Sequence, residues 1–369
     1  MSSTTTRTKA LTFTGPLAPR RLWWSRMVLP FLRILAVSSS LARLRFIHFA
    51  GWIVFGDLPG AKPPGWRTRP TMIFLSDFDG DQTEYLAAFG LAMPRAMRWS
   101  FGSCDEFPGP TPTRALIEYV HRGRQAELLH YSAYPDATVR DIDAALVVAE
   151  RLDALASAAS SLSDEDFQRR YRELLDSLAL APQLRPPGVL PGIWQALRSR
   201  PSVAGLTLAV PVGPGKTDEI RASIDKLAAE TPSLFATVAG LHFCRLALID
   251  VPGHGPGPHP DHLLFSAWFD GKVDDFIPRV VAELGDRSDA IWTGCRGYPG
   301  AGDPAALSRW IGQHRLRHSL FLNARSGVPM ERIRTSLERR EQALIALPGL
   351  QDLPSDELRR ELARLAAPG

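Results

Sequence analysis

The sequence FSAWFDG at residues 265–271 repeats four letters of FLSDFDG at residues 74–80, which lies 191 positions earlier. The same spacing continues beyond these stretches, and further identical pairs are Cys104 and Cys295, Pro108 and Pro299, Leu116 and Leu307, and Ile142 and Ile333. Upstream, small differences in loop length shift the spacing, so that LTFTGPLAP at 11–19 matches LTLAVPVGP at 206–214. Self-similarity at a nearly constant spacing indicates an internal repeat. The chain is therefore predicted to contain two copies of one structural unit.

The secondary structure of this unit is clearest in the second copy. Alternating, β-rich stretches predict strands at 206–212, 241–250, 262–269 and 290–295. Apolar residues at helical spacing predict helices at 217–230 and 276–284, with Thr217 as the N-cap of the first. This β-α-β-β-α-β order is the ferredoxin-like pattern. A helix at 304–316, a strand at 319–324 and a helix at 329–346 are predicted to follow it.

Four segments are predicted along the chain. They are a first ferredoxin-like repeat at 1–150, a helical and proline-rich linker at 151–205, a second repeat at 206–349 and a C-terminal helix at 350–369. Two tandem units would pack sheet against sheet, as a pseudo-twofold α+β barrel-like arrangement with extra helices. At 369 residues the chain is long enough for two such cores. The fold class is therefore predicted to be α+β.

Composition narrows the class of protein. An apolar content of 45% and a charged content of 22% are typical of a globular protein. The three cysteines are too few for a disulfide framework and lack the spacing of a zinc site, which favours a reducing, cytoplasmic location. No stretch is apolar over the length that a membrane-spanning helix needs. Nucleic acid is not expected as a partner, because no basic stripe is interleaved with aromatic residues.

A tandem pair of ferredoxin-like units resembles the dimeric α+β barrel superfamily, which includes the dye-decolourising peroxidases. The motif of those peroxidases is G-x-x-D-G, and its Asp assists peroxide cleavage beside a haem. Here Asp79 and Asp270 keep the final D-G, whereas the first glycine is absent from both stretches. The resemblance implies a peroxidase-like oxidoreductase with Asp270 and Asp79 as catalytic residues, and Arg245 is the third catalytic candidate. The alternative is structural, with each Asp as the N-cap of the following helix and each Gly in a turn conformation.

Haem is the cofactor that this resemblance implies, held by a histidine on the wall of an apolar cavity. His314 and His318 are predicted to lie one helical turn apart, and their counterparts in the first copy could not bind iron. His242 is the third candidate for cofactor binding. The alternatives are a solvated basic helix end for His314 and His318, and a hydrogen-bonded core residue for His242, because His48 is its counterpart in the first copy.

Two further patterns imitate binding motifs. The loop before the strand at 262–269 gathers four side chains that can bind metals, namely His254, His259, Asp261 and His262. Imidazole and carboxylate suit zinc, but the loop is rich in Pro and Gly, and a surface loop without metal is the preferred interpretation. GPGKT at 213–217 resembles a phosphate-binding loop, but Val210 stands where that motif requires its first glycine.

The N-terminal segment is where the two copies differ most. Residues 1–56 contain eight basic residues and no acidic ones. In the helix predicted at 20–37, apolar side chains surround a narrow stripe of Arg26, Pro30 and Arg33, and Pro30 predicts a kink or a restart. The two arginines also interrupt the apolar run that an export signal would need. The excess apolar surface predicts contact with an anionic membrane surface, a second copy of the chain or the linker.

Two functions from different classes follow from these patterns. The first is the binding of a hydrophobic small molecule or haem in a cavity between a sheet and its helices, with peroxidase-like oxidation as the reaction. The second is a non-catalytic peripheral membrane or scaffolding protein that keeps the fold without its chemistry. The expected location is cytoplasmic, with peripheral membrane association or self-association through residues 20–37.

Overall fold

The computed structural model describes residues 8–36, 45–56, 69–179, 202–250, 262–323, 325 and 327–366. The chain divides into two compact units, each made of two separate stretches. The first unit, Met1–Pro135 with Pro186–Gly327, contains both β-sheets. The second unit, Asp136–Arg185 with Val328–Gly369, is helical in its described residues. The predicted segment boundaries at 150, 205 and 349 follow the chain rather than these units, and they stay a prediction.

The first unit is built on two five-stranded sheets in which all neighbouring strands are antiparallel. In order across the first sheet the strands are β10 (His318–Asn323), β2 (Ile47–Phe55), β3 (Thr71–Asp79), β1 (Thr8–Pro16) and β4 (Arg124–Gln125). Across the second sheet they are β5 (Glu127–Ser132), β7 (Leu241–Ile249), β8 (His262–Asp270), β6 (Val203–Pro211) and β9 (Arg315–Leu316). The protein is therefore a mixed α+β protein.

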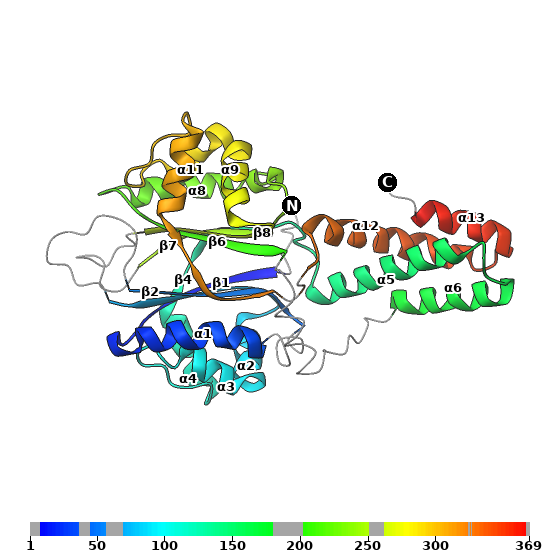
Figure 1. The fold of residues 1–369 in the computed structure, drawn as a ribbon, viewed down its shortest axis with the longest axis horizontal. Helices are drawn as coiled ribbons and strands as arrows, with labels where there is room; N and C mark the ends of the chain where they lie inside the picture. Colours follow the sequence, from blue (N-terminus) through cyan, green and yellow to red (C-terminus); the bar gives the residue numbers. More distant parts are fainter. Residues whose placement is uncertain are drawn as a thin grey trace. The chain divides into compact units, whose positions relative to one another are not determined.

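The two sheets exchange one edge strand each. Strand β10 comes late in the chain, yet it pairs with β2, while β5 comes early and pairs with β7. The central pairs also have matching registers, because Thr8 on β1 lies opposite Asp79 and Val203 on β6 lies opposite Asp270. Figure 1 shows the two sheets stacked, with helices on the outer side of each.

The helices of this unit cover the outer faces of the sheets (Figure 1). Those that follow the first sheet's strands are α1 (Leu22–Ala36), α2 (Gln82–Ala92), α3 (Pro94–Phe101) and α4 (Thr113–Gly123). Those of the second sheet are α8 (Thr217–Ala228), α9 (Val273–Leu284), α10 (Asp289–Trp292) and α11 (Pro304–Gln313). Side chains alternate across a strand, so Phe265 and Phe269 of β8 pack into the helix-side core, whereas Trp268 points between the sheets. Both faces of the central strands are therefore buried.

The second unit consists of α5 (Val139–Ala158), α6 (Asp164–Ala179), α12 (Met330–Ala346) and α13 (Ser355–Ala366). Their apolar stripes meet in one core that includes Leu152, Phe167 and Leu358. The start of α5 is fixed by a capping box, in which Thr138 and Asp141 satisfy each other's backbone N–H groups.

Two local predictions are wrong, and a third is wrong in one of its two alternatives. The segment predicted as a strand at 290–295 forms the short helix α10 and a turn, where the Asp289 carboxylate accepts hydrogen bonds from the Tyr298 hydroxyl and the Ala301 N–H. Thr217 is the first residue of α8, whose N-cap is Lys216 without a side-chain cap. Of the two alternatives predicted at Pro30, a restart is excluded because α1 is one helix from Leu22 to Ala36, and a kink stays a prediction. The other strands and helices predicted for the second copy are found.

Candidate active site between the two sheets

The interior between the sheets has an ionised centre at Asp77. This residue lies on β3 and is fully buried. Its Oδ1 atom is 2.9 Å from His130 Nε2, and its Oδ2 atom accepts a 2.6 Å hydrogen bond from Trp268 Nε1 and an ion pair from Arg245 Nη2. Strands β3, β5, β7 and β8 thus each contribute one side chain, so the centre depends on both sheets.

Arg245 is held in place by the backbone of the opposite sheet. Its Nη1 atom donates to the Leu11 carbonyl at 2.9 Å, and its Nη2 atom donates to the Ser76 carbonyl at 3.1 Å. Burial alone would raise the pKa of Asp77, but Arg245, His130 and Trp268 outweigh it and hold the pKa below its ordinary value. Asp77 is therefore a carboxylate at neutral pH.

His130 is the member of this centre that reaches solvent. Its side chain is 18% exposed, whereas those of Asp77 and Arg245 are buried, and its ring stacks on Phe243 at a centroid distance of 6.1 Å. Because an ionised carboxylate can only accept hydrogen bonds, the His130 Nε2 atom carries the proton. When the ring is neutral, its lone pair is on Nδ1, which makes this atom a base.

Trp268 fits this interior because two glycines face it. A Cβ atom added to Gly51 would lie 2.7 Å from the indole, and one added to Gly205 would lie 2.4 Å from it. Both distances are shorter than a carbon–carbon contact allows. The indole is thus placed by the absence of side chains on β2 and β6, and it stacks on Phe49 and Phe321 at 5.9 and 5.1 Å.

Asp79 and Asp270, the two candidates of the D-G motif, are partners of histidines on the neighbouring strand. His48 Nε2 is 2.8 Å from Asp79 Oδ1, and His242 Nε2 is 3.0 Å from Asp270 Oδ1. The N-cap interpretation is wrong, because the side chain that caps α2 is that of Asp81 and α9 has no side-chain cap. The glycine interpretation is confirmed, since Gly80 and Gly271 have positive φ angles of 89° and 94°.

One of these pairs extends into a chain of three groups. The Tyr134 hydroxyl is 2.9 Å from His242 Nδ1, while His242 Nε2 faces Asp270. Burial, with the charges of Asp77 and Asp270, raises the pKa of Tyr134 well above its ordinary value. The phenol therefore stays protonated and donates to His242, whose two ring nitrogens are both occupied. His242 is thus the hydrogen-bonded core residue of the alternative prediction.

His314 and His318 are not on one helix. His314 is the C-cap of α11 and its Nδ1 atom contacts the Trp310 carbonyl at 2.8 Å. His318 begins β10, where its Nε2 atom is 3.2 Å from Thr207 Oγ1 between the sheets. Burial and the charge of Arg315 lower the pKa of His318 to about 4. The helical spacing ends at Gln313 because the chain turns into the short strand β9.

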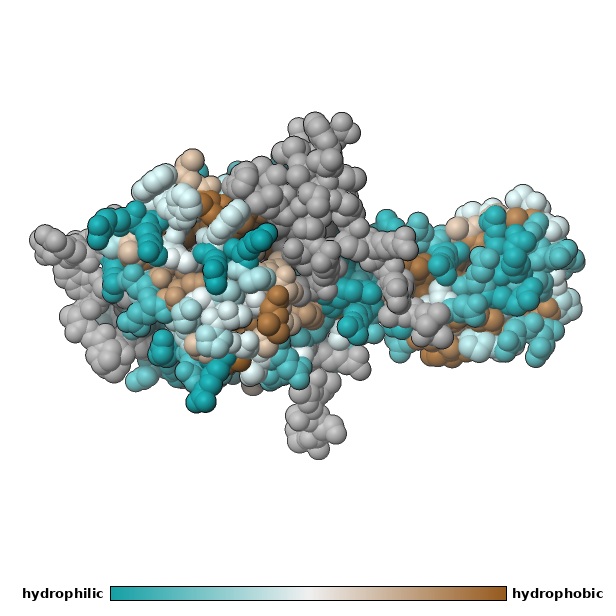
Figure 2. All heavy atoms as spheres, turned by 90° about the horizontal axis from the view of Figure 1, so that it is seen from below, coloured by the Kyte–Doolittle hydropathy of each residue, from teal (hydrophilic) through white to brown (hydrophobic). Residues whose placement is uncertain are grey.

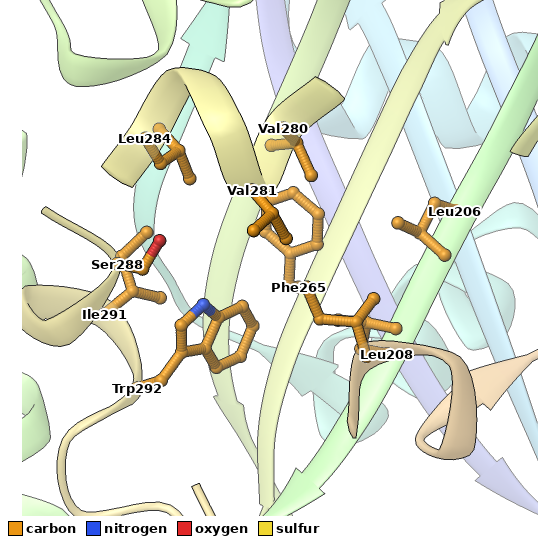
Figure 3. A pocket seen from close by; sticks show the side chains of 10 residues that line it. Leu206, Leu208, Phe265, Val280, Val281, Leu284, Ser288, Ile291 and Trp292 are labelled. Carbon is orange, nitrogen blue, oxygen red and sulfur yellow. The ribbon is translucent and has the colours of Figure 1, made fainter. Parts of the chain in front are cut away.

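His242 has no free ring nitrogen, so it does not fit an axial ligand of haem. His314 and His318 are separated by β9, and each uses one ring nitrogen in a contact within the core. A cavity does lie between the second sheet and its helices, between β6 and β8 on one side and α9 and α10 on the other (Figure 3). Its volume is about 10 Å³ and its lining is apolar apart from Ser288. That is space for about one water molecule, so this cavity has no room for haem.

Metal binding and thiol reactivity find little support in the described part of the chain. No group of three or more His, Cys, Asp or Glu side chains is arranged there to hold a metal ion. The loop with His254, His259 and Asp261 lies outside the described residues, and His262 begins β8 as a buried residue. Burial raises the pKa of the thiols of Cys104 and Cys295 to about 12, so neither is a thiolate at neutral pH.

The residues at the centre were only partly predicted. Arg245 was a candidate, whereas Asp77, His130 and Trp268 were missed. A signal for two of them was present in the opening repeat, because FLSDFDG and FSAWFDG differ at the position of Asp77 and Trp268. Their side chains are hydrogen-bonded to each other in the structure.

Comparisons with known proteins leave the family open. No protein-family model matches the chain, and no curated protein matches it. Among solved structures, one from Fusobacterium nucleatum subsp. nucleatum ATCC 25586, titled "Putative monooxygenase", is similar over 87% of this chain and 96% of that chain. The sequence identity is 8% and the TM-score is 0.28, and a likeness at that level supports no conclusion about function.

Proposed function

We propose that His130 is the base of an acid–base site, at which it exchanges protons with a small, partly apolar molecule. The observation that carries this proposal is the 2.9 Å contact between the part-exposed His130 ring and the buried carboxylate of Asp77. A carboxylate that orients an imidazole and stabilises its protonated form is the arrangement found around general bases. Arg245 and Trp268 support it because they keep Asp77 ionised, so the proton stays on the ring.

The proton transfer follows from the tautomer. Nδ1 of His130 takes a proton from the bound molecule, and the ring becomes an imidazolium ion that keeps its Nε2–H on Asp77. The return of this proton to the molecule or to water restores the neutral ring. Phe243 and Phe49, which are buried beside the His130 ring, make its surroundings apolar. A positioned base of this kind contributes typically about 10²–10⁴-fold to a rate.

The site is further proposed to lie within a duplicated ferredoxin-like fold. The strand orders β2-β3-β1-β4 and β7-β8-β6-β9 support this proposal, because they match strand for strand and both equal the ferredoxin-like order. In this alignment Asp77 corresponds to Trp268, and Arg245 corresponds to Gly51. The charged groups thus occupy positions where the two copies differ, whereas the His48–Asp79 and His242–Asp270 pairs occur in both.

Haem-dependent, peroxidase-like oxidation remains a proposal that rests on the resemblance alone. With the histidines arranged as described, His314→Ala and His318→Ala should leave the Soret region of protein mixed with hemin unchanged. Loss of a Soret band in either variant would return that histidine to the role of ligand.

A general-base reaction with a chromogenic product tests the acid–base proposal. The substrate 5-nitrobenzisoxazole opens when a base removes its carbon-bound proton, and the full-length protein should accelerate this reaction. His130→Gln should lower the rate at least about 10²-fold, which is the smallest contribution of a positioned base. His121→Gln is the matched control, since His121 is exposed on α4, and it should react like the original protein.

A second measurement separates the proposal from a non-catalytic protein. Nitrogen-15 spectra of the imidazoles should show the Nε2–H tautomer for His130, and Asp77→Asn should change that tautomer balance. Equal rates for the original protein, His130→Gln and His121→Gln would reject the acid–base site. That result would favour the other class, a scaffolding protein that keeps the fold without its chemistry.

A further inference from the structure

The exposed face of α1 carries large apolar side chains. Trp23, Trp24 and Met27 are 64%, 50% and 65% exposed, and the two indoles touch edge to face at 6.2 Å. The opposite face of the helix is buried, because Ser25, Leu29 and Leu32 point into the first unit. The counterpart helix α8 has no exposed large apolar side chain. The excess apolar surface predicted for residues 20–37 is thus present on the described part of α1.

Helix α3 extends this face. It packs against α1, and the Arg21 Nη1 atom donates a 2.5 Å hydrogen bond to the Gly102 carbonyl at the C-terminus of α3. Helix α3 presents Trp99, which is 45% exposed, together with the exposed Arg95 and Arg98. We call the exposed Arg, Trp and Met residues of α1, α3 and the short helix Pro19–Arg21 the α1–α3 surface: Arg20, Arg21, Trp23, Trp24, Arg26, Met27, Arg95, Arg98 and Trp99.

The charge of the α1–α3 surface has one sign. Its five arginines are accompanied by no acidic residue within α1, α3 or the turn at Pro19–Arg21. The neighbouring carboxylates belong to other segments, namely Asp81 and Glu84 at the start of α2 and Asp105 and Glu106 after α3. Figure 2 views the molecule from the side of α1–α4 and shows strongly polar and apolar residues mixed over this region.

We infer that the α1–α3 surface docks on an anionic phospholipid bilayer, independently of the acid–base site. Tryptophan has an apolar body and a polar N–H, and it settles at the level of lipid headgroups. Arginines beside it are attracted to anionic lipids. A helix with one buried face and one exposed face of Trp and Arg lies on the surface of a bilayer. No helix in the described residues is long and apolar enough to cross a membrane.

The charge also decides against a second copy of this chain as the occupant. Twofold contacts use the same patch on both subunits. Two copies of the α1–α3 surface would bring arginines against arginines, and like charges facing each other in an interface are repulsive. An anionic bilayer supplies the opposite charge over the whole surface.

Co-sedimentation of the full chain with vesicles tests this inference. Vesicles of phosphatidylcholine mixed with phosphatidylserine should bind the protein, and vesicles of phosphatidylcholine alone should bind it much less. Binding should weaken as salt is added, because the arginines are exposed. Arg95→Gln with Arg98→Gln should lower the partition coefficient about 25-fold, at about fivefold for each charge near the surface. Trp23→Ser with Trp24→Ser should lower it by a similar or larger factor.

Two controls separate docking from general effects on the protein. Arg221→Gln removes an exposed arginine on α8, and Ile345→Ser removes an exposed apolar side chain on α12. Both variants should bind like the original protein. Equal binding to charged and neutral vesicles, no binding to either, or equal losses in the controls would each overturn the inference. A dimer that dissociates in Trp23→Ser with Trp24→Ser, without vesicle binding by the original protein, would assign the surface to self-association instead.

Discussion

Breaking the Asp77–Arg245 ion pair should destabilise the protein strongly. Asp77→Asn keeps the shape of the side chain but removes its charge, which leaves the Arg245 guanidinium buried with the Leu11 and Ser76 carbonyls as its remaining acceptors. Removing one partner of a buried pair costs about 3–5 kcal/mol. For a unit of this size the loss corresponds to a fall of the melting temperature by roughly 10 °C.

Replacing both charges should recover most of that loss. Asp77→Leu combined with Arg245→Met removes two buried charges together, and exchange of a buried pair for apolar side chains is often close to neutral. We expect the double variant to lie within about 2 kcal/mol of the original protein, although it leaves the Trp268 N–H without its acceptor. The free energy of unfolding is measured by urea denaturation followed through tryptophan fluorescence, for the single variants Asp77→Asn, Asp77→Leu and Arg245→Met and for the double variant.

The same pair predicts how stability depends on pH. The pKa of folded Asp77 lies below its ordinary value, so its contribution is complete above the ordinary pKa of aspartate and is lost as the pH falls through the folded pKa. Asp77→Asn should remove this part of the acid destabilisation. If the single variants cost less than about 1 kcal/mol, or if their costs add in the double variant, the ion pair does not hold the two sheets in the way described.

Three further predictions concern neighbours of this pair. Gly205→Ala should destabilise the protein by about 1–3 kcal/mol in a thermal melt, because its Cβ atom would meet the Trp268 indole. The control Gly312→Ala, on the open surface of α11, should be neutral or slightly stabilising. Equal effects of the two substitutions would refute the close packing around Trp268. Tyr134→Phe should cost about 1–2 kcal/mol in urea denaturation because it removes the hydrogen bond to His242, and a cost near zero would show that this bond is not formed in solution. The pKa of His318 is about 4 in the folded protein and about 6.5 in an unfolded chain, so lowering the pH from 6.5 towards 4 favours unfolding by at most about 3 kcal/mol. His318→Gln should therefore flatten the pH dependence of the unfolding free energy in that range. An unchanged slope would contradict this prediction.

The sequence predicts the elements of the sheets well because their signals are local. Strands with buried faces on both sides, such as LHFCRLALI on β7, are nearly continuous apolar runs that no surface helix would show. The segment at 290–295 was wrongly predicted as a strand, because buried apolar residues such as Ile291 and Trp292 occur both in strands and in buried helices. Periodicity cannot separate those two cases in so short a run.

The exchange of β5 and β10 could not be predicted from a pattern along the chain. Contacts between distant parts of the chain decide which strand pairs at the edge of each sheet. The residues of β5 and β10 alone do not indicate which sheet either strand joins. The site was missed for a related reason. Asp77 and His130 are 53 residues apart and Asp77 and Arg245 are 168 residues apart, so only the folded sheets bring them together. The D-G motif instead selected Asp79 and Asp270, which stand at the same place in FLSDFDG and FSAWFDG.

Synthesis from the N-terminus exposes one edge of the first sheet long before its neighbour exists. Strand β2 ends at Phe55, and the strand that covers it begins only at His318. At ordinary rates of translation this interval lasts on the order of tens of seconds. During that time β2 is an open edge able to pair with any extended chain, and β5 waits for β7 in the same way. The first sheet therefore cannot be completed until nearly the whole chain has been made, so folding of the two sheets is coupled to the end of synthesis rather than to its beginning.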